Sequence, residues 1–567
     1  MHRRLNHVAF FATVVFLASA CADHMKPAEW DQLVNAFLDS TFAANPDVAV
    51  NAGRHEFDGK LPDWSDAGLK AEAARLHTWR DRIDKADTVG LDSARRFERN
   101  YMIAVIDGRL FWLEKADWPH KNPTFYTDAL DPDPYVSREY APLETRIKSY
   151  TAYARSVPTA AAQIKANLKP PMPRTFIDRA EGAFGGFADF YGSDVPKVFA
   201  SVKDPALQKD FKAANDSAIA AMNDLKKYFE AQRPTQNENY AMGAELFKDM
   251  LWATERVDTP LDELKKIAQA DLDRNLKSLD EACSKFAPGM SVKDCVGGAN
   301  ANKPKGTAVD EATKQLTDLR AFIGKNDLVT IPGTEQARVH ESPPYMRWNS
   351  AYINIPGPYE KNLPSTYYYS PPDPSWSAAE RAQYIPGKAD LLFTTVHEVW
   401  PGHFLQFLHA NRSPSKFGQI FVGYAFAEGW AHYAEEMMWD AGLGNGDPET
   451  HIGQLTNALL RNVRFLSTIG LHTGGMTVAE SEKMFEDQGH QDAGNAKQQA
   501  ARGTFDPAYL NYTLGKLMIM KLREDWTSTR GGRNAWKQFH DAFLNYGGPP
   551  IPLVRRAMLP GDSGSLF

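Results

Sequence analysis

The sequence predicts a large, mainly α-helical protein of two lobes, with a small β-sheet beside a helix that carries histidines. Apolar residues recur at spacings of three and four over most of the chain. β-Branched and aromatic residues gather between 328 and 370, and the helical pattern returns just before the segment HEVWPGH. The chain has 567 residues, which is long enough for two lobes. We place them at 21–283 and 308–567, on either side of a hinge at 284–307.

Residues 1–20 are typical of a signal peptide for export. Arg3-Arg4 precede an apolar run over residues 8–18, which is shorter than the roughly 20 residues that span a bilayer. The end of the run, LASAC, resembles a bacterial lipoprotein cleavage box with Cys21 as the lipidated residue. Residues 18–20 would equally suit ordinary signal-peptidase cleavage. We expect an exported bacterial protein, either periplasmic or anchored to the membrane through Cys21.

Four long segments of the first lobe have the helical spacing of apolar residues. They are residues 66–87, 150–168, 204–232 and 259–283. The last of them begins with Thr259-Pro260, a capping residue followed by a first-turn proline. We interpret the apolar stripes of these helices as core packing.

The chain has three cysteines, and two of them lie beside the predicted hinge. If Cys21 is lipidated, Cys283 and Cys295 can form a disulfide in an oxidising compartment. The alternative is two unpaired thiols. Residues 284–307 are rich in Gly, Pro, Asn and Lys, which predicts a loop braced by that disulfide.

Three short strands are predicted ahead of the histidine motif. The segments are LVTIPG (328–333), SAYINIPG (350–357) and STYYYSPP (365–372), each broken by proline or glycine. An edge strand at this place could pair with an extended peptide backbone.

The segment HEVWPGH places two histidines, His397 and His403, six residues apart. Zinc hydrolases usually separate such histidines by four residues, about 40° around a helix, whereas six residues give about 120°. On a regular helix the two rings could not share a metal. They could do so if a turn at Val399–Gly402 swings His403 back, and Gly402 makes such a turn sterically easy. The alternative is that both are ordinary histidines at helix ends.

A second helix over 421–442 offers a third ligand. Glu428 lies 25 positions after His403 and has small and apolar neighbours, where a carboxylate needs a cation. Glu435 and Glu436 are interpreted as part of a solvated acidic face.

These motifs carry a resemblance to a known family. HEVWPGH followed by FAEGWAHYAEE resembles the bacterial family catalogued as domain of unknown function 885, and the likeness extends over nearly the whole mature chain. That family is similar in motif layout to gluzincin metallopeptidases such as thimet oligopeptidase. The resemblance implies a metallopeptidase-like helical fold with one Zn²⁺ held by His397, His403 and Glu428. It also implies that Glu398 is the catalytic base.

Three residues in the later blocks of the family have chemistry suited to catalysis or substrate binding: His472, Arg502 and Tyr512. The alternative is that Arg502 and Arg464 form ion pairs between helices while Tyr512 packs in the core. Tyr509 is a rival to Tyr512. An arginine near the site could instead bind the C-terminal carboxylate of a peptide.

Two departures from the family pattern affect the substrate side. Thr468 stands where the family usually has an aspartate, so a hydrogen bond that orients His472 is expected to be absent. DPAYLNY (506–512) replaces a Pro-Gly-Gln stretch ahead of Tyr512.

The leading hypothesis is an exported zinc metallopeptidase that hydrolyses short peptides by Glu-assisted attack of a zinc-activated water. One alternative is a non-catalytic envelope or binding lipoprotein that keeps the fold. Another is a zinc hydrolase of other amides, such as cell-wall stem peptides. A net charge of −7 without any Lys/Arg-rich run argues against a nucleic-acid partner.

Overall fold

Helices make up most of the described chain, as the spacing of apolar residues predicts. The structure, a computed structural model, describes residues 24–567 except for 344–345, 348–349, 375 and 563. The four predicted helices are present: α3 (Asp66–Asp84), α8 (Leu143–Asn167), α11 (Pro205–Glu230) and α13 (Leu261–Phe286). The predicted signal peptide and Cys21 lie outside the described residues.

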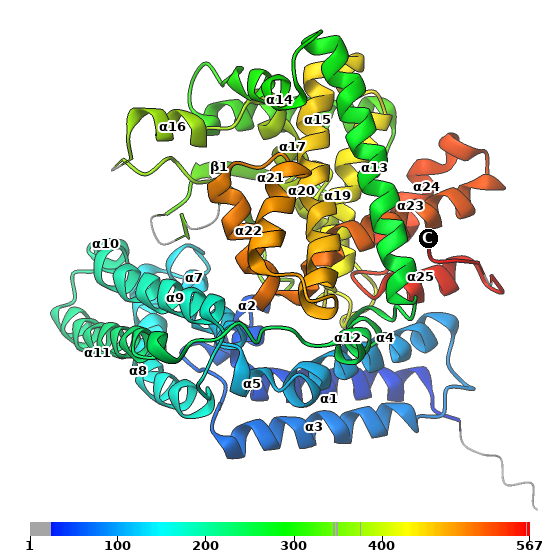
Figure 1. Cartoon of the computed structure of the whole chain (residues 1–567). Helices are drawn as coiled ribbons and strands as arrows, with labels where there is room; N and C mark the ends of the chain where they lie inside the picture. The colour runs from blue at the N-terminus through cyan, green and yellow to red at the C-terminus, as the bar shows by residue number, and fades with distance from the viewer. Residues whose placement is uncertain (1–23, 344–345, 348–349, 375, 563) are drawn as a thin grey trace, which may run out of the picture.

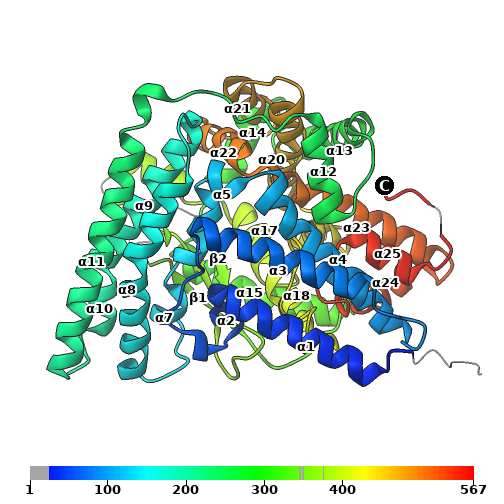
Figure 2. The same ribbon diagram turned by 90° about the horizontal axis from the view of Figure 1, so that it is seen from below.

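The N-terminal part forms two groups of helices, each around its own apolar core. One consists of α1 (Pro27–Ala44), α2 (Pro46–Ala52), α3 and α4 (Ser93–Leu110). The other consists of α8, α9 (Arg174–Ser193) and α11, which enclose Tyr150, Phe184 and Met222. In both views α8, α9 and α11 lie together at one side of the molecule, and α1 runs beside α3 (Figures 1 and 2).

The chain forms further helices. They are α5 (Trp118–Lys121), α6 (Thr124–Thr127), α7 (Asp133–Val136), α10 (Val195–Phe199), α12 (Ala244–Glu255), α15 (Ala308–Asn326), α16 (Ala378–Tyr384), α21 (Val478–Asp487), α22 (Ala493–Phe505), α24 (Trp536–Leu544) and α25 (Ile551–Met558). In the part of the chain that the structure describes, no helix has the length and apolar character that crossing a bilayer requires.

The predicted hinge at 284–307 contains a helix, which corrects the prediction of a loop. Residues Val292–Ala301 form α14, whose first turn is capped by the Ser291 hydroxyl. The predicted disulfide is confirmed: Cys283 of α13 is bonded to Cys295 of α14. Both cysteines are buried in one apolar cluster with Leu455 and Leu459. The composition of the segment was misleading because this tertiary contact stabilises a helix that its glycines disfavour.

The two-lobed arrangement is not confirmed. Helix α13, which lies before the predicted boundary, packs along α20 (Pro448–Thr473), which lies after it. The largest apolar core likewise joins Phe247 and Leu264 to Phe404 and Trp430.

A three-stranded sheet lies beside the histidine-bearing helix, as predicted. Its strands β1 (Ala337–Glu341), β2 (Ala351–Asn354) and β3 (Ser365–Tyr369) are ordered β1-β3-β2. β1 pairs in parallel and β2 antiparallel with the central strand. Two of the predicted strands match β2 and β3. The third prediction was wrong, because residues 328–333 form no strand and β1 begins at Ala337.

Five helices of the largest core position the candidate site: α17 (Lys388–Glu398), α18 (His403–Ala410), α19 (Tyr424–Asp440), α20 and α23 (Asn511–Ser528). Helices α19 and α23 approach closely where Gly429 faces Gly515. A Cβ built on Gly515 would lie 2.1 Å from the Ala425 carbonyl oxygen. Glycine at this crossing therefore brings the first turn of α23 close to Glu428.

Candidate metal centre

The chain leaves the helical path between the two histidines of the motif. Helix α17 ends at Glu398 and α18 begins at His403, with a non-helical turn over residues 399–402. The Gly402 amide donates to the Val396 carbonyl oxygen at 2.9 Å. A Cβ on Gly402 would lie only 1.7 Å from the His397 carbonyl oxygen. The predicted turn is therefore present, and it requires glycine at this position.

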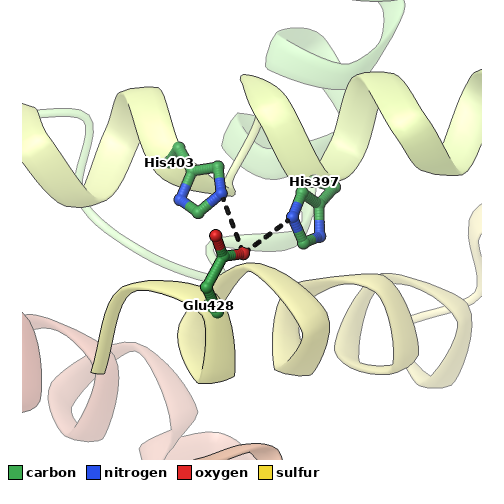
Figure 3. Close-up of side chains that lie close together, drawn as sticks. All are labelled: His397, His403 and Glu428. Atoms are coloured by element: carbon green, nitrogen blue, oxygen red, sulfur yellow. Dashed lines mark hydrogen bonds and ion pairs between the residues drawn. The ribbon is translucent and has the colours of Figure 1, made fainter. Parts of the chain in front are cut away.

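The turn brings three side chains together. His397 Nε2 and His403 Nε2 lie 3.2 Å and 3.3 Å from the same Glu428 oxygen, Oε2. Figure 3 shows the two imidazoles reaching down from successive helices toward Glu428 on α19. One ligand atom from each residue lies within 4.8 Å of the others. The predicted convergence of His397, His403 and Glu428 is present.

These separations suit a tetrahedral metal ion. Ligand atoms about 2.0–2.1 Å from Zn²⁺ lie about 3.3 Å apart at the tetrahedral angle. Two imidazole nitrogens and one carboxylate oxygen are a donor set that zinc binds in catalytic sites, where a fourth position stays open. The side chains of His403 and Glu428 are 13% and 20% exposed, so an ion and a small ligand can reach them. His397, His403 and Glu428 therefore fit the zinc ion that the sequence predicts.

The two carboxylates around His397, those of Glu428 and Glu435, favour a positive charge between them. Burial and the nearby Arg461 favour the neutral ring, but hydrogen bonds to Glu428 and Glu435 raise the pKa of His397 to about 9. Burial also disfavours the Glu428 carboxylate, yet His403 and His397 hold the pKa of Glu428 well below its ordinary value. A divalent cation would supply this positive charge and leave both rings neutral, as metal ligation requires.

Glu435 and Arg461 support His397 from the side opposite Glu428. Glu435 Oε1 lies 2.7 Å from His397 Nδ1, which donates to it and so points Nε2 at Glu428. Arg461 of α20 lies 3.2 Å from the same carboxylate oxygen. The interpretation of Glu435 and Glu436 as a solvated face was wrong, since both are buried. Charged partners on other helices make their burial possible.

Glu398 follows His397 directly and is half-buried at the end of α17. Its carboxylate has no hydrogen-bond partner among the residues that the structure describes. Burial raises the pKa of Glu398, although His403 and His397 partly offset this effect. A carboxylate without a structural partner, next to two converging imidazoles, is free to hydrogen-bond a water or a substrate.

Tyr512 lies against the other side of the centre. Its ring stacks beside that of His397, with a 6.2 Å distance between the ring centroids. Burial and the Glu428 carboxylate raise the pKa of Tyr512, so its hydroxyl stays a hydrogen-bond donor. Arg502 reaches this ring too, with Cζ 5.9 Å from the Tyr512 centroid. Arg502 is also held by Asp506 and by the Tyr424 hydroxyl, both at 2.9 Å.

His472 does not join these residues. It is 1% exposed, and its Nε2 hydrogen-bonds the Gly503 carbonyl oxygen at 2.8 Å. Its Nδ1 accepts from the Met242 amide at 3.4 Å. Both ring nitrogens therefore have backbone partners. These contacts favour a structural role for His472 over the predicted catalytic role. Thr468 hydrogen-bonds the Pro507 carbonyl oxygen, so it is not the residue that orients His472.

Comparison with known proteins gives the family. Residues 46–558 match the description "Bacterial protein of unknown function (DUF885)". The chain belongs to this family. No curated protein matches the sequence.

Two solved structures share the fold of this DUF885 protein. A "putative lipoprotein of unknown function" from Shewanella oneidensis is 23% identical, with a TM-score of 0.77 over 94% of this chain and 99% of that one. A "putative lipoprotein" from Colwellia psychrerythraea is 18% identical, with a TM-score of 0.77 over 93% and 98%. A "putative oligoendopeptidase F" from Bacillus anthracis str. Ames, at a TM-score of 0.31 and 12% identity, is too distant to support an argument.

Three residues of this DUF885 site were missed from the sequence: Glu435, Arg461 and Tyr424. A signal existed for Glu435, which is seven residues, or two helical turns, after Glu428 and thus on the same face of α19. Tyr424 had a similar signal, because it lies four residues before Glu428 at the start of α19. Arg461 has no motif around it, and only the packing of α20 against α19 brings it to Glu435.

Proposed function

We propose that this protein is an exported, zinc-dependent metallopeptidase that hydrolyses peptide bonds in short peptides. The observation that carries the proposal is the convergence of His397 Nε2 and His403 Nε2 on one oxygen of Glu428, at 3.2 and 3.3 Å. Glu435 adds support, because a carboxylate that accepts from the remote ring nitrogen is the usual partner of a metal-ligating histidine.

His397, His403 and Glu428 would hold the ion, and Zn²⁺ when bound supplies a Lewis acid that makes water and a substrate carbonyl more reactive. Glu398 then acts as the general base. It takes a proton from the attacking water and passes the same proton to the leaving amine, so it returns to its starting state. The absence of a structural partner for Glu398 among the described residues supports this role.

Tyr512 is the donor for the negative charge that develops on the carbonyl oxygen. Its hydroxyl is attached to a ring that stacks beside His397, and a donor fixed in advance costs no reorganisation during the reaction. Arg502 and Tyr424 hold this side of the site in place through Asp506.

Export is part of the proposal and rests on the sequence. The basic start, the short apolar run and LASAC predict removal of residues 1–20. Attachment to the membrane would then follow from lipidation of Cys21. Mass spectrometry of the mature N-terminus distinguishes a lipid-modified Cys21 from ordinary cleavage.

The test combines metal content with hydrolysis. Purified protein should bind one equivalent of zinc and cleave members of a short-peptide library that includes cell-wall stem peptides. Glu398→Gln should retain zinc but lose about 10²- to 10⁴-fold in rate. Equal product from wild type and Glu398→Gln would overturn the role of Glu398. Protein that takes up no stoichiometric zinc would favour the non-catalytic lipoprotein instead.

A further inference from the structure

Three arginines gather around Tyr512, and one of them has no acidic partner in the part of the chain that the structure describes. Arg461 contacts Glu435 at 3.2 Å, and Arg502 contacts Asp506 at 2.9 Å. Among the described residues, Arg464 of α20 makes only one side-chain hydrogen bond, from Nε to the neutral amide oxygen of Gln499 at 2.9 Å. Its two terminal nitrogens have no hydrogen bond or ion pair with any described residue.

Arg464 is nevertheless a largely buried residue, with 7% of its surface exposed. Burial and the neighbouring charge of Arg502 lower the pKa of Arg464. A largely buried charge without a counter-charge is destabilising, because nothing offsets its desolvation. The faces of Tyr512 and Tyr509 compensate only in part, because an aromatic face carries no full counter-charge. A bound anion would supply the counter-charge that Arg464 lacks among the described residues.

The position of Arg464 relative to the metal centre limits what this anion can be. Arg464 Cζ lies 4.7 Å from the Tyr512 ring centroid, which lies 6.2 Å from the His397 ring centroid. The guanidinium therefore lies at most about 11 Å from the His397 ring. One or two residues of extended peptide cover about 3.5–7 Å. This upper limit, which must also include the bonds to the metal and to the arginine, leaves no room for a longer stretch of peptide.

We propose that Arg464 binds the free C-terminal carboxylate of the substrate, so that the enzyme cleaves short peptides one or two residues from the C-terminus. This inference rests on the proposed function and names its substrate class. The two terminal guanidinium nitrogens offer the paired donors that match a carboxylate. Arg461 and Arg502 are unsuited to this role because Glu435 and Asp506 already occupy them.

Peptide binding tests the inference without relying on turnover. The probe is N-acetyl-trialanine as the free acid, compared with its C-terminal carboxamide, titrated calorimetrically into zinc-loaded Glu398→Gln protein. The acid should bind about 10- to 100-fold more tightly, the range expected for charge-assisted hydrogen bonds. Equal affinities for acid and amide, or binding of neither, would overturn the inference.

Two further substitutions, each added to Glu398→Gln, assign the preference to Arg464. Arg464→Gln should abolish it, and Gln499→Glu should abolish it too by giving Arg464 a carboxylate partner within the chain. Gln499→Glu changes little in size, so it keeps the test valid if Arg464→Gln folds poorly. Arg381→Gln, at an exposed arginine of α16, should leave the preference intact. A preference that survives both substitutions would assign the carboxylate to another residue.

The outcome separates this inference from the proposed function. Wild-type protein that prefers the acid, yet hydrolyses no peptide, would retain the carboxylate site and overturn the peptidase. Protein that hydrolyses acid and amide substrates with the same kcat/KM would retain the peptidase and overturn the carboxylate site.

Discussion

Glu435 Oε1 lies 2.7 Å from His397 Nδ1, at the edge of the imidazole away from the Nε2 atom that faces Glu428. Glu435 is fully buried, and Arg461 and His397 lower its pKa despite the cost of burial. The carboxylate is therefore charged, and it fixes both the orientation and the tautomer of the ring.

Glu435→Gln should weaken zinc binding by about 10- to 100-fold, the usual effect of removing such a partner. The amide is a poorer acceptor and also leaves Arg461 without its counter-charge. The dissociation constant for zinc, measured by competition with a chelator, checks this expectation. Glu486→Gln, at an exposed position of α21, is the matched control and should leave the constant unchanged. Unaltered affinity in Glu435→Gln would remove Glu435 from the metal centre.

The turn between the histidines gives a second prediction, at Gly402. In Gly402→Ala the new methyl group would overlap the His397 and Val396 carbonyl oxygens, at 1.7 and 2.5 Å. Both are backbone atoms, so α17 and α18 must move apart, and His403 moves with α18. We expect the protein to lose zinc and about 1–3 kcal/mol of stability from overpacking.

The control for this substitution is another glycine to alanine change. Gly324 lies inside α15 with nothing within 4 Å of a built Cβ. Gly324→Ala should retain zinc and gain up to about 1 kcal/mol of stability, because alanine is the better helix former. Zinc content and thermal unfolding measure both variants. A Gly402→Ala protein with full zinc content would show that the turn does not set the position of His403.

The sequence predicts those parts of this structure that depend on local pattern. The spacing of apolar residues places α3, α8, α11 and α13, and the angular argument for His397 and His403 predicts the turn at Gly402. The prediction that Glu428 lies near the histidines follows from its apolar neighbours, among which a carboxylate needs a cation. Each of these inferences uses residues within a few turns of one another.

What the sequence fails to predict depends on distant partners. Glu436 resembles a surface residue, yet it is buried because Lys516 and Arg274 reach it from α23 and α13. The role of Arg461 depends on the packing of α20 against α17 and α19. β1 is missed because three of its residues, Ala337–Glu341, are charged or polar and give no apolar strand pattern. Its pairing with β3 makes it a strand. No local pattern encodes such contacts.

The buried ion cluster around Lys516 gives a third prediction. Lys516 is fully buried, with Nζ 2.8 Å from Asp271 and 3.0 Å from Glu436. Lys516→Met would leave these two buried carboxylates with Arg274 as their remaining cationic partner. We expect a loss of about 3–5 kcal/mol in the free energy of unfolding, the range for removing one member of a buried pair.

Denaturant unfolding measures this loss, and the same helix offers a control. Lys521 pairs with Asp525 and is 32% exposed, so Lys521→Met should cost less than about 1 kcal/mol. Similar losses in both variants would mean that the Lys516 cluster contributes no more than a surface pair.

His540 gives a prediction about pH, because it is fully buried as a neutral ring. Its Nδ1 donates to the Leu328 carbonyl oxygen at 2.6 Å, and its Nε2 accepts from the Tyr433 hydroxyl at 2.7 Å. Burial lowers the pKa of His540 to about 3 in the folded protein, whereas an unfolded histidine has a pKa of about 6.5. Below pH 6.5 the unfolded chain therefore takes up a proton that the folded chain does not.

The contribution of His540 to stability is thus fully present above pH 6.5 and is lost as the pH falls toward 3. At pH 5 the loss amounts to about 2 kcal/mol, at about 1.4 kcal/mol per pH unit. The check is the free energy of unfolding of wild type and His540→Gln at pH 7.5 and pH 5. Wild type should lose about 2 kcal/mol more than the variant, because His432 and His472, whose pKa values burial also lowers to about 4, titrate in both proteins and cancel. Equal losses would mean that His540 takes up a proton in the folded protein as readily as in the unfolded chain, and would overturn this prediction.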